Sequence, residues 1–363
     1  MMNAITRRSA LIAGSMIAAT SAAKGLSSPA KYRRIACEEG YLSPGVLSAN
    51  TLITIPGVPL ITRDGPVADL ARQLADVGAE RIATMDRDGV DMQLLLLSSP
   101  GVQVFPTREA IALARDANDF VSDACRKFPT RLAALAAFAP QDPNAAAREI
   151  ERGVRSLGLK GGIVNSHTDG AYLDNTRYWP IFEAAEALDV PLYIHPREPA
   201  GAMRAVLAGP LTGGAAWAYS VEVGTHLLML MQAGVFDQFQ KLKVVVGHMG
   251  EGLPFWLSRL DNRWLEQRVR MTASRTSIPM RRLPSEYMRT NVWITSSGMN
   301  ELEPLRLSQQ VLGIDRVLYA TDYPFENQGE TIAAVERMPL SPAVKRAFFE
   351  TNAESLFRLA PAS

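Results

Sequence analysis

The sequence predicts a single distorted (β/α)8 barrel, a TIM barrel, with inserted lid loops. Eight apolar runs of strand length recur along the chain, and amphipathic segments of helix length separate them. Near-continuous apolar strands that alternate with helices are typical of a parallel sheet that is covered on its outer side. Eight such units in one chain are typical of a closed barrel.

The predicted strands and helices follow one another in regular order. The apolar runs lie at residues 33–39, 91–99, 132–140, 159–166, 191–196, 243–248, 292–297 and 317–324. Helices are expected at residues 107–128, 143–156, 175–188 and 254–268. The third run, LAALAAFAP, is the weakest of the eight because its alanines would also suit a helix. Two stretches, 40–68 and 197–222, exceed ordinary loop length, which is typical of lids and binding loops.

The first 30 residues have the layout of an export signal. Arg7 and Arg8 precede an apolar stretch at residues 10–19, and a small-residue triplet follows at 21–23. This order resembles a twin-arginine signal, and the apolar part is too short and too rich in Ala and Gly to span a membrane. We therefore expect export by the twin-arginine machinery, removal of residues 1–30, a periplasmic location and one barrel domain over residues 31–363. An amphipathic N-terminal helix is the alternative.

The composition argues against several classes of function. At 363 residues and 47% hydrophobic, the chain can bury a large core. Its 38 basic and 37 acidic residues give a net charge of +1, without a basic run in the body, so we expect no nucleic-acid partner. Cys37 and Cys125 do not make a disulfide framework, and we interpret Cys37 as a buried core thiol. A small-molecule enzyme fits these features better.

Polar residues stand where the predicted strands end. They are Glu38 and Glu39 after the first run, Asn165, Ser166 and His167 after the fourth, His195 after the fifth, His248 after the sixth, Ser296 and Ser297 after the seventh, and Asp322 after the eighth. In a barrel, the carboxyl ends of the strands meet on the catalytic face. Because neighbouring residues on a strand face opposite ways, one glutamate of the pair can face the mouth while the other turns outward.

Three of these residues together suit a metal ion. Glu38, His195 and Asp322 offer two carboxylates and one imidazole, a set suited to Mn²⁺, Zn²⁺ or Fe²⁺ with positions left open for substrate or water. A cation would also relieve the repulsion between clustered carboxylates. Glu251 follows His248 closely enough to orient and charge its imidazole. Each residue alone would fit an ordinary structural role, so their shared position in barrel order favours a site.

Four motifs follow one another in order after residue 32: IACEE, LYIHPREP, VVVGHMGEGLPFWLSRLDNR and YATDYPFE. They resemble the signatures of the amidohydrolase-2 branch of the amidohydrolase superfamily. The resemblance is greatest to its metal-dependent non-oxidative decarboxylases of phenolic acids, which include γ-resorcylate and 5-carboxyvanillate decarboxylases. The aminocarboxymuconate semialdehyde decarboxylases are more distant members. This resemblance implies the barrel fold independently of the strand pattern.

The resemblance also implies roles for individual residues. It implies metal ligation by Glu38, His195 and Asp322, a relay pair of His248 and Glu251, and substrate contact by Arg259 and Arg81. For each arginine, a solvated position on a helix surface remains the alternative. In the implied mechanism, Asp322 protonates the ring carbon that bears the carboxylate, and CO2 leaves. One divalent metal ion and a small carboxylic acid substrate are implied, without an organic cofactor, and a homodimer or homotetramer is expected.

One position departs from the family pattern. Many relatives carry Glu-x-His at the first strand, whereas here Gly40 follows the glutamate pair. Losing one imidazole leaves a harder and more open site, which favours Mn²⁺ over Zn²⁺. It also leaves open a site that binds metal poorly, or one that serves other chemistry.

Three functions remain compatible with the sequence. The leading hypothesis is a decarboxylase of a hydroxylated aromatic or related unsaturated carboxylic acid. The second is a metal-dependent hydrolase of an ester, a lactone or a C–C bond. The third is a non-catalytic periplasmic binding protein, which the missing histidine at Gly40 motivates. Release of CO2, consumption of water or binding without turnover would distinguish them.

Overall fold

The structure, a computed structural model, describes residues 32–54, 60–65, 67–274 and 279–361. The export signal expected at residues 1–30 lies outside the described residues. Residues Tyr32–Ser363 group into one compact unit by their contacts. Within the described part of the chain, no helix has the length and apolar character needed to cross a bilayer.

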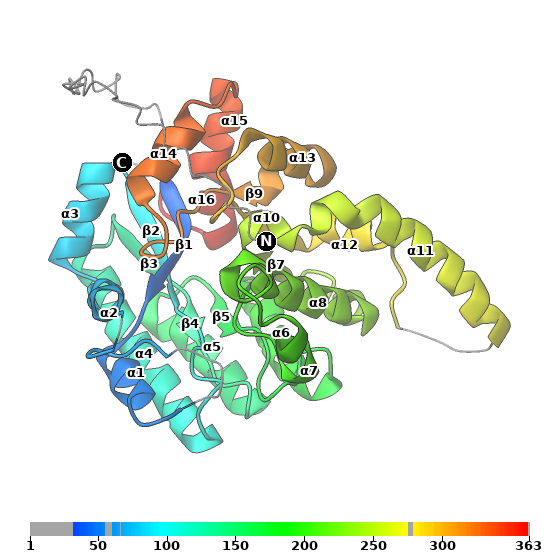
Figure 1. Ribbon diagram of the computed structural model, residues 1–363, viewed down its shortest axis with the longest axis horizontal. Coiled ribbons are helices and arrows are strands. Elements are labelled where there is room, and N and C mark those ends of the chain that lie inside the picture. Colours follow the sequence, from blue (N-terminus) through cyan, green and yellow to red (C-terminus); the bar gives the residue numbers. More distant parts are fainter. Residues whose placement is uncertain (1–31, 55–59, 66, 275–278, 362–363) are drawn as a thin grey trace, which may run out of the picture. The chain divides into compact units, whose positions relative to one another are not determined.

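The described strands are all parallel and form a distorted barrel (Figure 1). They are β1 (Ile35–Tyr41), β2 (Met92–Leu97), β3 (Leu132–Ala134), β4 (Ala136–Ala137), β5 (Gly162–Asn165), β6 (Pro191–His195), β7 (Lys243–Val246), β8 (Val292–Thr295) and β9 (Val317–Leu318). One sheet has the order β1-β2-β3, and the other contains β4 to β9 in chain order. The barrel prediction is confirmed, and each of the eight apolar runs contains a strand.

The alanine-rich third run is strand in two pieces. Only Leu135 separates β3 from β4, and its N–H donates to the Leu95 carbonyl at 2.9 Å. The next N–H, from Ala136, donates to Gly161 at 2.8 Å on the other side. Small side chains thus let one short run bond to both sheets, and tertiary pairing overrides the helix propensity of alanine.

Two backbone hydrogen bonds link the first strand to the segment that follows the last strand. Cys37 N–H donates to the Tyr319 carbonyl at 2.9 Å, and Gly40 N–H donates to the Tyr323 carbonyl at 2.8 Å. These bonds join β1 to the segment that follows β9, where no regular strand pairing is found among the described residues. The carboxyl end of β1 therefore lies beside Asp322.

Helices surround the strands (Figure 1). They are α1 (Pro44–Asn50), α2 (Ala68–Ala75), α3 (Ala79–Asp88), α4 (Thr107–Lys127), α5 (Pro143–Leu157), α6 (Trp179–Leu188), α7 (Gly201–Val206), α8 (Ala218–Gln232), α9 (Val235–Gln238), α10 (His248–Glu251), α11 (Leu253–Ser274), α12 (Pro284–Thr290), α13 (Leu302–Leu312), α14 (Gln328–Glu336), α15 (Pro342–Arg346) and α16 (Asn352–Phe357). The four helices expected from the sequence correspond to α4, α5, α6 and α11. Local signals explain α5: Asp142 accepts from Ala145 N–H at 2.9 Å, Pro143 begins the helix, and Gly158 ends it at φ 74°.

The two long stretches are not plain loops. Residues 40–68 contain α1, where the Ser43 hydroxyl accepts from Val46 N–H at 3.2 Å and Pro44 begins the helix. Residues 197–222 contain α7 and the beginning of α8. Capping at a Ser-Pro step allows a short helix even in a Pro- and Gly-rich segment. A lid function for either stretch stays a prediction.

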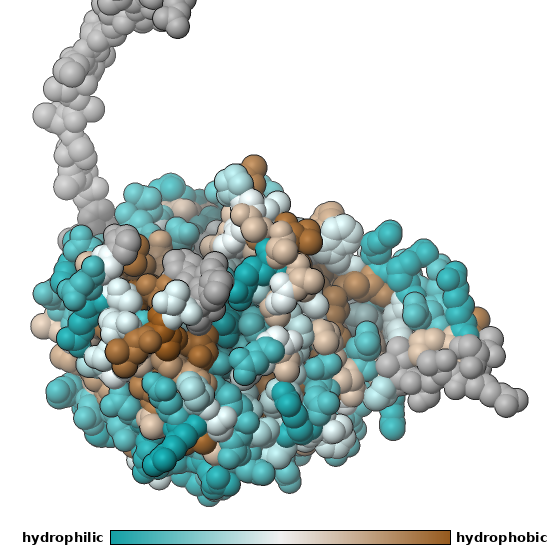
Figure 2. Space-filling view, turned by 60° about the horizontal axis from the view of Figure 1, so that its bottom comes forward, coloured by the Kyte–Doolittle hydropathy of each residue, from teal (hydrophilic) through white to brown (hydrophobic). Residues whose placement is uncertain are grey.

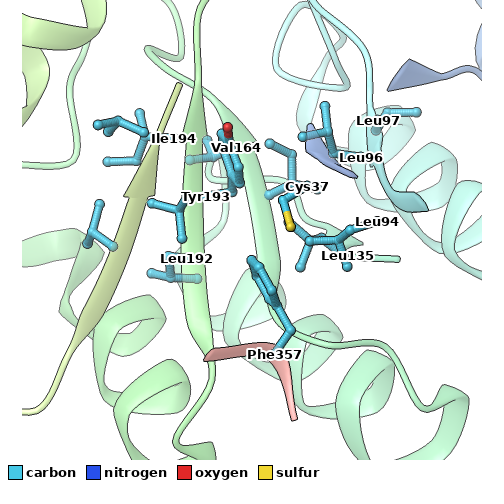
Figure 3. Packing of buried hydrophobic residues seen from close by; sticks show 14 of the residues in the cluster. Cys37, Leu94, Leu96, Leu97, Leu135, Val164, Leu192, Tyr193, Ile194 and Phe357 are labelled. Atoms are coloured by element: carbon cyan, nitrogen blue, oxygen red, sulfur yellow. The ribbon is translucent and has the colours of Figure 1, made fainter. Parts of the chain in front are cut away.

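The core lies inside the barrel and between strands and helices. Every residue of β1, β2, β5 and β6 is buried, as expected for parallel strands covered on both faces. Figure 3 shows Cys37 among apolar side chains that include Leu94 and Phe357. The prediction of a buried core thiol is confirmed, and burial raises the pKa of this thiol well above its usual value.

The surface is mixed in character. The face in Figure 2 is mostly hydrophilic, with hydrophobic areas between the polar ones. Large apolar side chains are also exposed on α11, among them Phe255, Trp256 and Val269. Figure 1 shows that this helix projects from the barrel.

Candidate active site

Glu38 lies at the centre of a cluster at the carboxyl ends of the strands. Its side chain is fully buried, and Oε2 accepts hydrogen bonds from the hydroxyls of Thr295 and Ser297. The other oxygen, Oε1, has no hydrogen-bond partner. It lies 3.8 Å from Nε2 of His195 and 3.9 Å from Nε2 of His248. An unpaired buried carboxylate oxygen is costly, so this oxygen is available to a cation.

Asn165 of β5 orients the ring of His195, which ends β6. The Asn165 Nδ2 donates to the Leu97 carbonyl at 3.0 Å, so its Oδ1 is the atom that faces His195 Nδ1, at 2.9 Å. Nδ1 of His195 therefore carries the proton, and Nε2 presents a lone pair toward Glu38. Burial lowers the pKa of His195 to about 4, which keeps the imidazole in the neutral, metal-binding form. The sequence placed Asn165 at a strand end but did not indicate this role.

His248 and Glu251 pair across a tight turn. Nδ1 of His248 lies 3.0 Å from Oε1 of Glu251, and its Nε2 lies 3.8 Å from Oδ2 of Asp322. The backbone has positive φ at all three residues: 46° at His248, 56° at Glu251 and 63° at Asp322. Side-chain-bearing residues seldom adopt this conformation, and it is concentrated at functional sites. The turn brings Glu251 back to His248, as the sequence predicted.

Burial and charge oppose each other within the cluster. Burial raises the pKa of Asp322 to about 6. Burial alone would lower the pKa of His248, but the carboxylates of Glu251 and Glu38 outweigh it and raise this pKa well above its usual value. For Glu38, burial acts to raise the pKa, but His248 and His195 outweigh it, so the pKa is lowered. Of the two carboxyl groups Glu38 and Asp322, Asp322 thus holds a proton more readily near neutral pH.

The cluster fits one divalent cation without being a complete cage. Among the described residues, no group of three or more His, Cys, Asp or Glu side chains forms a ready-made metal site. The separations of 3.8 and 3.9 Å nevertheless lie within the about 4 Å that two donors on one ion can span. Gly247 makes room, because a Cβ there would lie 2.5 Å from Oε1 of Glu38. Carboxylate oxygens with one or two imidazoles suit Mn²⁺.

Packing closes the position where many relatives carry a further histidine. A Cβ at Gly40 would lie 2.5 Å from Oγ of Ser98, 3.0 Å from Cδ2 of Leu74 and 3.3 Å from Cε2 of Phe325. An imidazole would enter only if these side chains moved. Glu38 is therefore the candidate ligand that β1 supplies.

Glu39, the neighbour of Glu38, faces a different set of partners. It is fully buried, and Oε1 accepts from Thr321 N–H at 2.9 Å. Oε2 accepts from the Thr321 hydroxyl at 2.5 Å and from Tyr323 N–H at 3.0 Å. The expected opposite orientation of the two glutamates is thus present. The contacts of Glu39 with both neighbours of Asp322 were missed from the sequence, which carries no signal for them.

Arg81 is fully buried rather than on a helix surface. Its guanidinium donates to Oε1 of Gln93 at 3.0 Å, to the Gly40 carbonyl at 2.8 Å and to the Asp76 carbonyl at 2.7 Å. It also lies 4.9 Å from the centre of the Tyr323 ring. These contacts brace the carboxyl end of β1, so the surface alternative is wrong. A contact between Arg81 and substrate stays a prediction.

Arg259 lies on the exposed side of α11. Among the hydrogen bonds and ion pairs of the described residues, none joins it to Glu38, His195, His248 or Asp322. The structure therefore does not bring Arg259 into the cluster within one chain. Its contact with a substrate carboxylate stays a prediction.

A second buried cluster has the residue types of a hydrolytic triad, but the hydrogen bond between its serine and its histidine runs in the wrong direction for catalysis. Oγ of Ser166 lies 2.9 Å from Oε1 of Glu222 and 3.0 Å from Nδ1 of His226. Nε2 of His226 accepts from Leu173 N–H at 3.1 Å, so Nδ1 carries the proton and donates to Ser166. A nucleophilic serine needs an imidazole that accepts its proton. Ser166 instead donates to Glu222, and this cluster is a structural network.

Comparison with known proteins agrees with the motif resemblance. Residues 71–359 match the family model described as amidohydrolase. The γ-resorcylate decarboxylase of Polaromonas sp. is 36% identical over 301 residues, covering 80% of this chain and 90% of that protein. The γ-resorcylate decarboxylase of Rhodococcus jostii is 35% identical over 339 residues, covering 90% and 98%.

Solved structures show the same relationship. A 5-carboxyvanillate decarboxylase of Novosphingobium aromaticivorans, solved with manganese and a methoxy-hydroxy-nitrobenzoic acid, is 38% identical with a TM-score of 0.83. The alignment covers 91% of this chain and 98% of that one. A dihydroxybenzoic acid decarboxylase of Polaromonas sp., solved with manganese and 2-nitroresorcinol, is 34% identical with a TM-score of 0.80, covering 91% and 98%. The chain therefore belongs to the amidohydrolase family, in the branch of the γ-resorcylate and 5-carboxyvanillate decarboxylases.

Proposed function

We propose that this protein is a metal-dependent, non-oxidative decarboxylase of a hydroxylated aromatic or related unsaturated carboxylic acid. One observation carries the proposal: Asp322, which can hold a proton, and the unpartnered Oε1 of Glu38 lie 3.8 and 3.9 Å from Nε2 of His248. Relatives over most of the chain are decarboxylases by name, and two solved ones hold manganese together with an aromatic ligand. We propose Mn²⁺ as the native ion, with Zn²⁺ as the alternative.

The residues divide into a cation site and a proton donor. Glu38 and His195 would hold the cation, and Asp322 lies at the same site. When bound, a divalent cation supplies Lewis acidity and a template for substrate oxygens. Asn165 keeps the free lone pair of His195 directed into the site. Thr295 and Ser297 fix the other oxygen of Glu38, so that the carboxylate does not rotate away.

Asp322 performs the proton transfer. Its carboxyl group gives a proton to the ring carbon that bears the carboxylate, because its raised pKa keeps a protonated fraction near neutral pH. The bond from that carbon to the carboxylate then breaks, its electron pair returns to the ring, and CO2 leaves. About 18% of the Asp322 side chain is exposed, so solvent can restore its proton. His248, held by Glu251, faces Asp322 and stabilises its anionic form after transfer.

A metal-dependent hydrolase of an ester, a lactone or a C–C bond uses the same cation site and is the second candidate. The observation that favours it is the unpartnered Oε1 of Glu38 beside the neutral His195, which fits a cation able to activate water, whereas His248, whose pKa is raised well above its usual value, is poorly suited to act as a base. The third candidate, a non-catalytic binding protein, would not need a proton donor in its site. The raised pKa of Asp322 argues against it.

The test uses protein from residue 31 onward, freed of metal with a chelator and reloaded with Mn²⁺. It is incubated with ortho-hydroxybenzoic acids that include γ-resorcylate and 5-carboxyvanillate, and with aryl esters and lactones. We expect CO2 and the phenol by mass spectrometry, only after reloading. Incorporation of water without CO2 would make the protein a hydrolase. Ligand binding with neither product would refute both enzyme readings.

Export and self-association are further proposals. The paired Arg7 and Arg8 support export to the periplasm by the twin-arginine machinery. The apolar side chains exposed on α11, Phe255, Trp256 and Val269, support a homodimer or homotetramer. We expect the full chain to reach the periplasmic fraction, and the variant with Arg7→Lys and Arg8→Lys to remain in the cytoplasm. Light scattering on the mature protein should give a multiple of the monomer mass; a monomer would refute self-association.

A further inference from the structure

Asp322 lies where the barrel has the least regular support. It follows the two-residue strand β9, and no regular strand pairing joins β9 to β1 in the described part of the chain. Its φ of 63° lies in the left-handed region, which is costly for a residue with a side chain. Such a conformation persists only when the surrounding contacts hold it, so some contact must fix this segment.

Glu39 makes that contact on both sides of Asp322. One carboxylate oxygen accepts from Thr321 N–H at 2.9 Å, and the other accepts from Tyr323 N–H at 3.0 Å. The Thr321 hydroxyl adds a third hydrogen bond at 2.5 Å. Glu39 and Thr321 are fully buried, so water does not compete for these bonds.

These donors require a side chain with two acceptor oxygens, which a carboxyl group offers. The two backbone N–H groups face different oxygens, so a glutamine in either orientation would place its NH2 group against one of them. The mismatch would leave a buried backbone donor unpaired or push the segment away.

The rest of the contacts around Tyr323 reinforce the same connection. The Tyr323 carbonyl accepts from Gly40 N–H at 2.8 Å, and Arg81 lies 4.9 Å from the centre of its ring. Arg81 in turn donates to the Gly40 carbonyl at 2.8 Å. The end of β1 and the segment 321–323 are thus bound together where a strand ladder is missing.

We propose that Glu39 is a positioning residue, which clamps Thr321 and Tyr323 to β1 and so holds Asp322 at the angle needed for proton transfer. The positioning role rests on the proposed decarboxylase function, whereas the clamp itself does not. Glu38 then faces the cation site, and Glu39 holds the segment that carries the proton donor.

The experiment compares wild-type protein with Glu39→Gln, Thr321→Val and Glu336→Gln. Thr321→Val removes one of the three hydrogen bonds and keeps both backbone bonds. Glu336→Gln is the matched control, because Glu336 pairs with Arg34 near the opposite end of β1. Hydrogen–deuterium exchange of the metal-free proteins is followed on peptides that cover residues 319–326. The kcat and KM for decarboxylation are then measured with saturating Mn²⁺.

We expect the amides of residues 321 and 323 to exchange about 10-fold faster or more in Glu39→Gln, without comparable change elsewhere. The kcat should fall about 100-fold with little change in KM, the effect of a small displacement of a reacting group. Thr321→Val should shift both readouts in the same direction by less, and Glu336→Gln should leave both unchanged. If Glu39→Gln does not fold, the graded effect of Thr321→Val decides.

Unchanged protection of residues 321 and 323 would overturn the clamp, and an unchanged kcat in a folded, Mn²⁺-loaded Glu39→Gln would overturn the positioning role. A kcat that recovers when Mn²⁺ is raised above the concentration that saturates the wild-type protein would also overturn it, because the defect would then lie in metal binding. If wild-type protein decarboxylates none of the acids, the proposed function fails, and the exchange measurement still decides the clamp.

Discussion

Asp322→Asn is expected to lower the rate of decarboxylation by about 10²- to 10⁴-fold, the contribution of a positioned general acid. Asparagine keeps the shape and an oxygen for a cation, but it has no acidic proton to give to a ring carbon. The variant should therefore retain Mn²⁺ and substrate and fail to turn over. The measurement is CO2 release at saturating Mn²⁺, with metal content determined on the same sample.

Glu326→Gln is the matched control for this prediction. Glu326 is an exposed carboxylate in the turn that follows Asp322, so its neutralisation changes the nearby charge without removing the donor. It should leave the rate within a factor of about two, as for a screened surface charge. An Asp322→Asn protein that still releases CO2 at the wild-type rate would assign the proton donor to another group.

Gly247→Ala is expected to weaken Mn²⁺ binding by about 10- to 100-fold. The new Cβ would lie 2.5 Å from Oε1 and 2.9 Å from Oε2 of Glu38. The φ of Gly247 is −76°, which alanine adopts freely, so the effect comes from collision rather than from backbone strain. The carboxylate must move, and it is held in place by Thr295 and Ser297.

The affinity for Mn²⁺ is measured by titration of the metal-free protein. Gly329→Ala serves as the control, because its Cβ would meet Asp88 only at ordinary contact distance, 3.4 Å from Oδ1. That substitution should leave the affinity unchanged. Equal Mn²⁺ affinity in Gly247→Ala and wild type would exclude Glu38 as a ligand in its present orientation.

The sequence predicted more of the fold than of the local geometry. The eight apolar runs located all nine described strands, because burial of a parallel sheet demands continuous apolar runs. It was less informative for the segments 40–68 and 197–222, where the short helices α1 and α7 interrupt the expected loops. Helices of this length depend on tertiary packing as much as on their own residues.

For the site, the positions of the polar residues along the chain indicated which residues form the cluster, but not the contacts among them. Glu38, His195, His248 and Asp322 stand at strand ends. The barrel brings Glu38 within 3.8 Å of His195 and 3.9 Å of His248, and His248 within 3.8 Å of Asp322. Arg259 illustrates the limit: it is exposed on α11, no hydrogen bond or ion pair of the described residues joins it to the cluster, and its contact with a substrate carboxylate stays a prediction.

The sequence by itself determined the barrel, the face that carries the chemistry and the residue types that meet there. The periodicity of apolar residues suffices for these three features, because it shows which residues are buried when the chain folds. Only the tertiary structure decided that Glu39 holds both neighbours of Asp322, that Asn165 sets the tautomer of His195, and that packing closes Gly40. These depend on register and contact between residues far apart in the chain, and a periodic pattern specifies a face but not a distance.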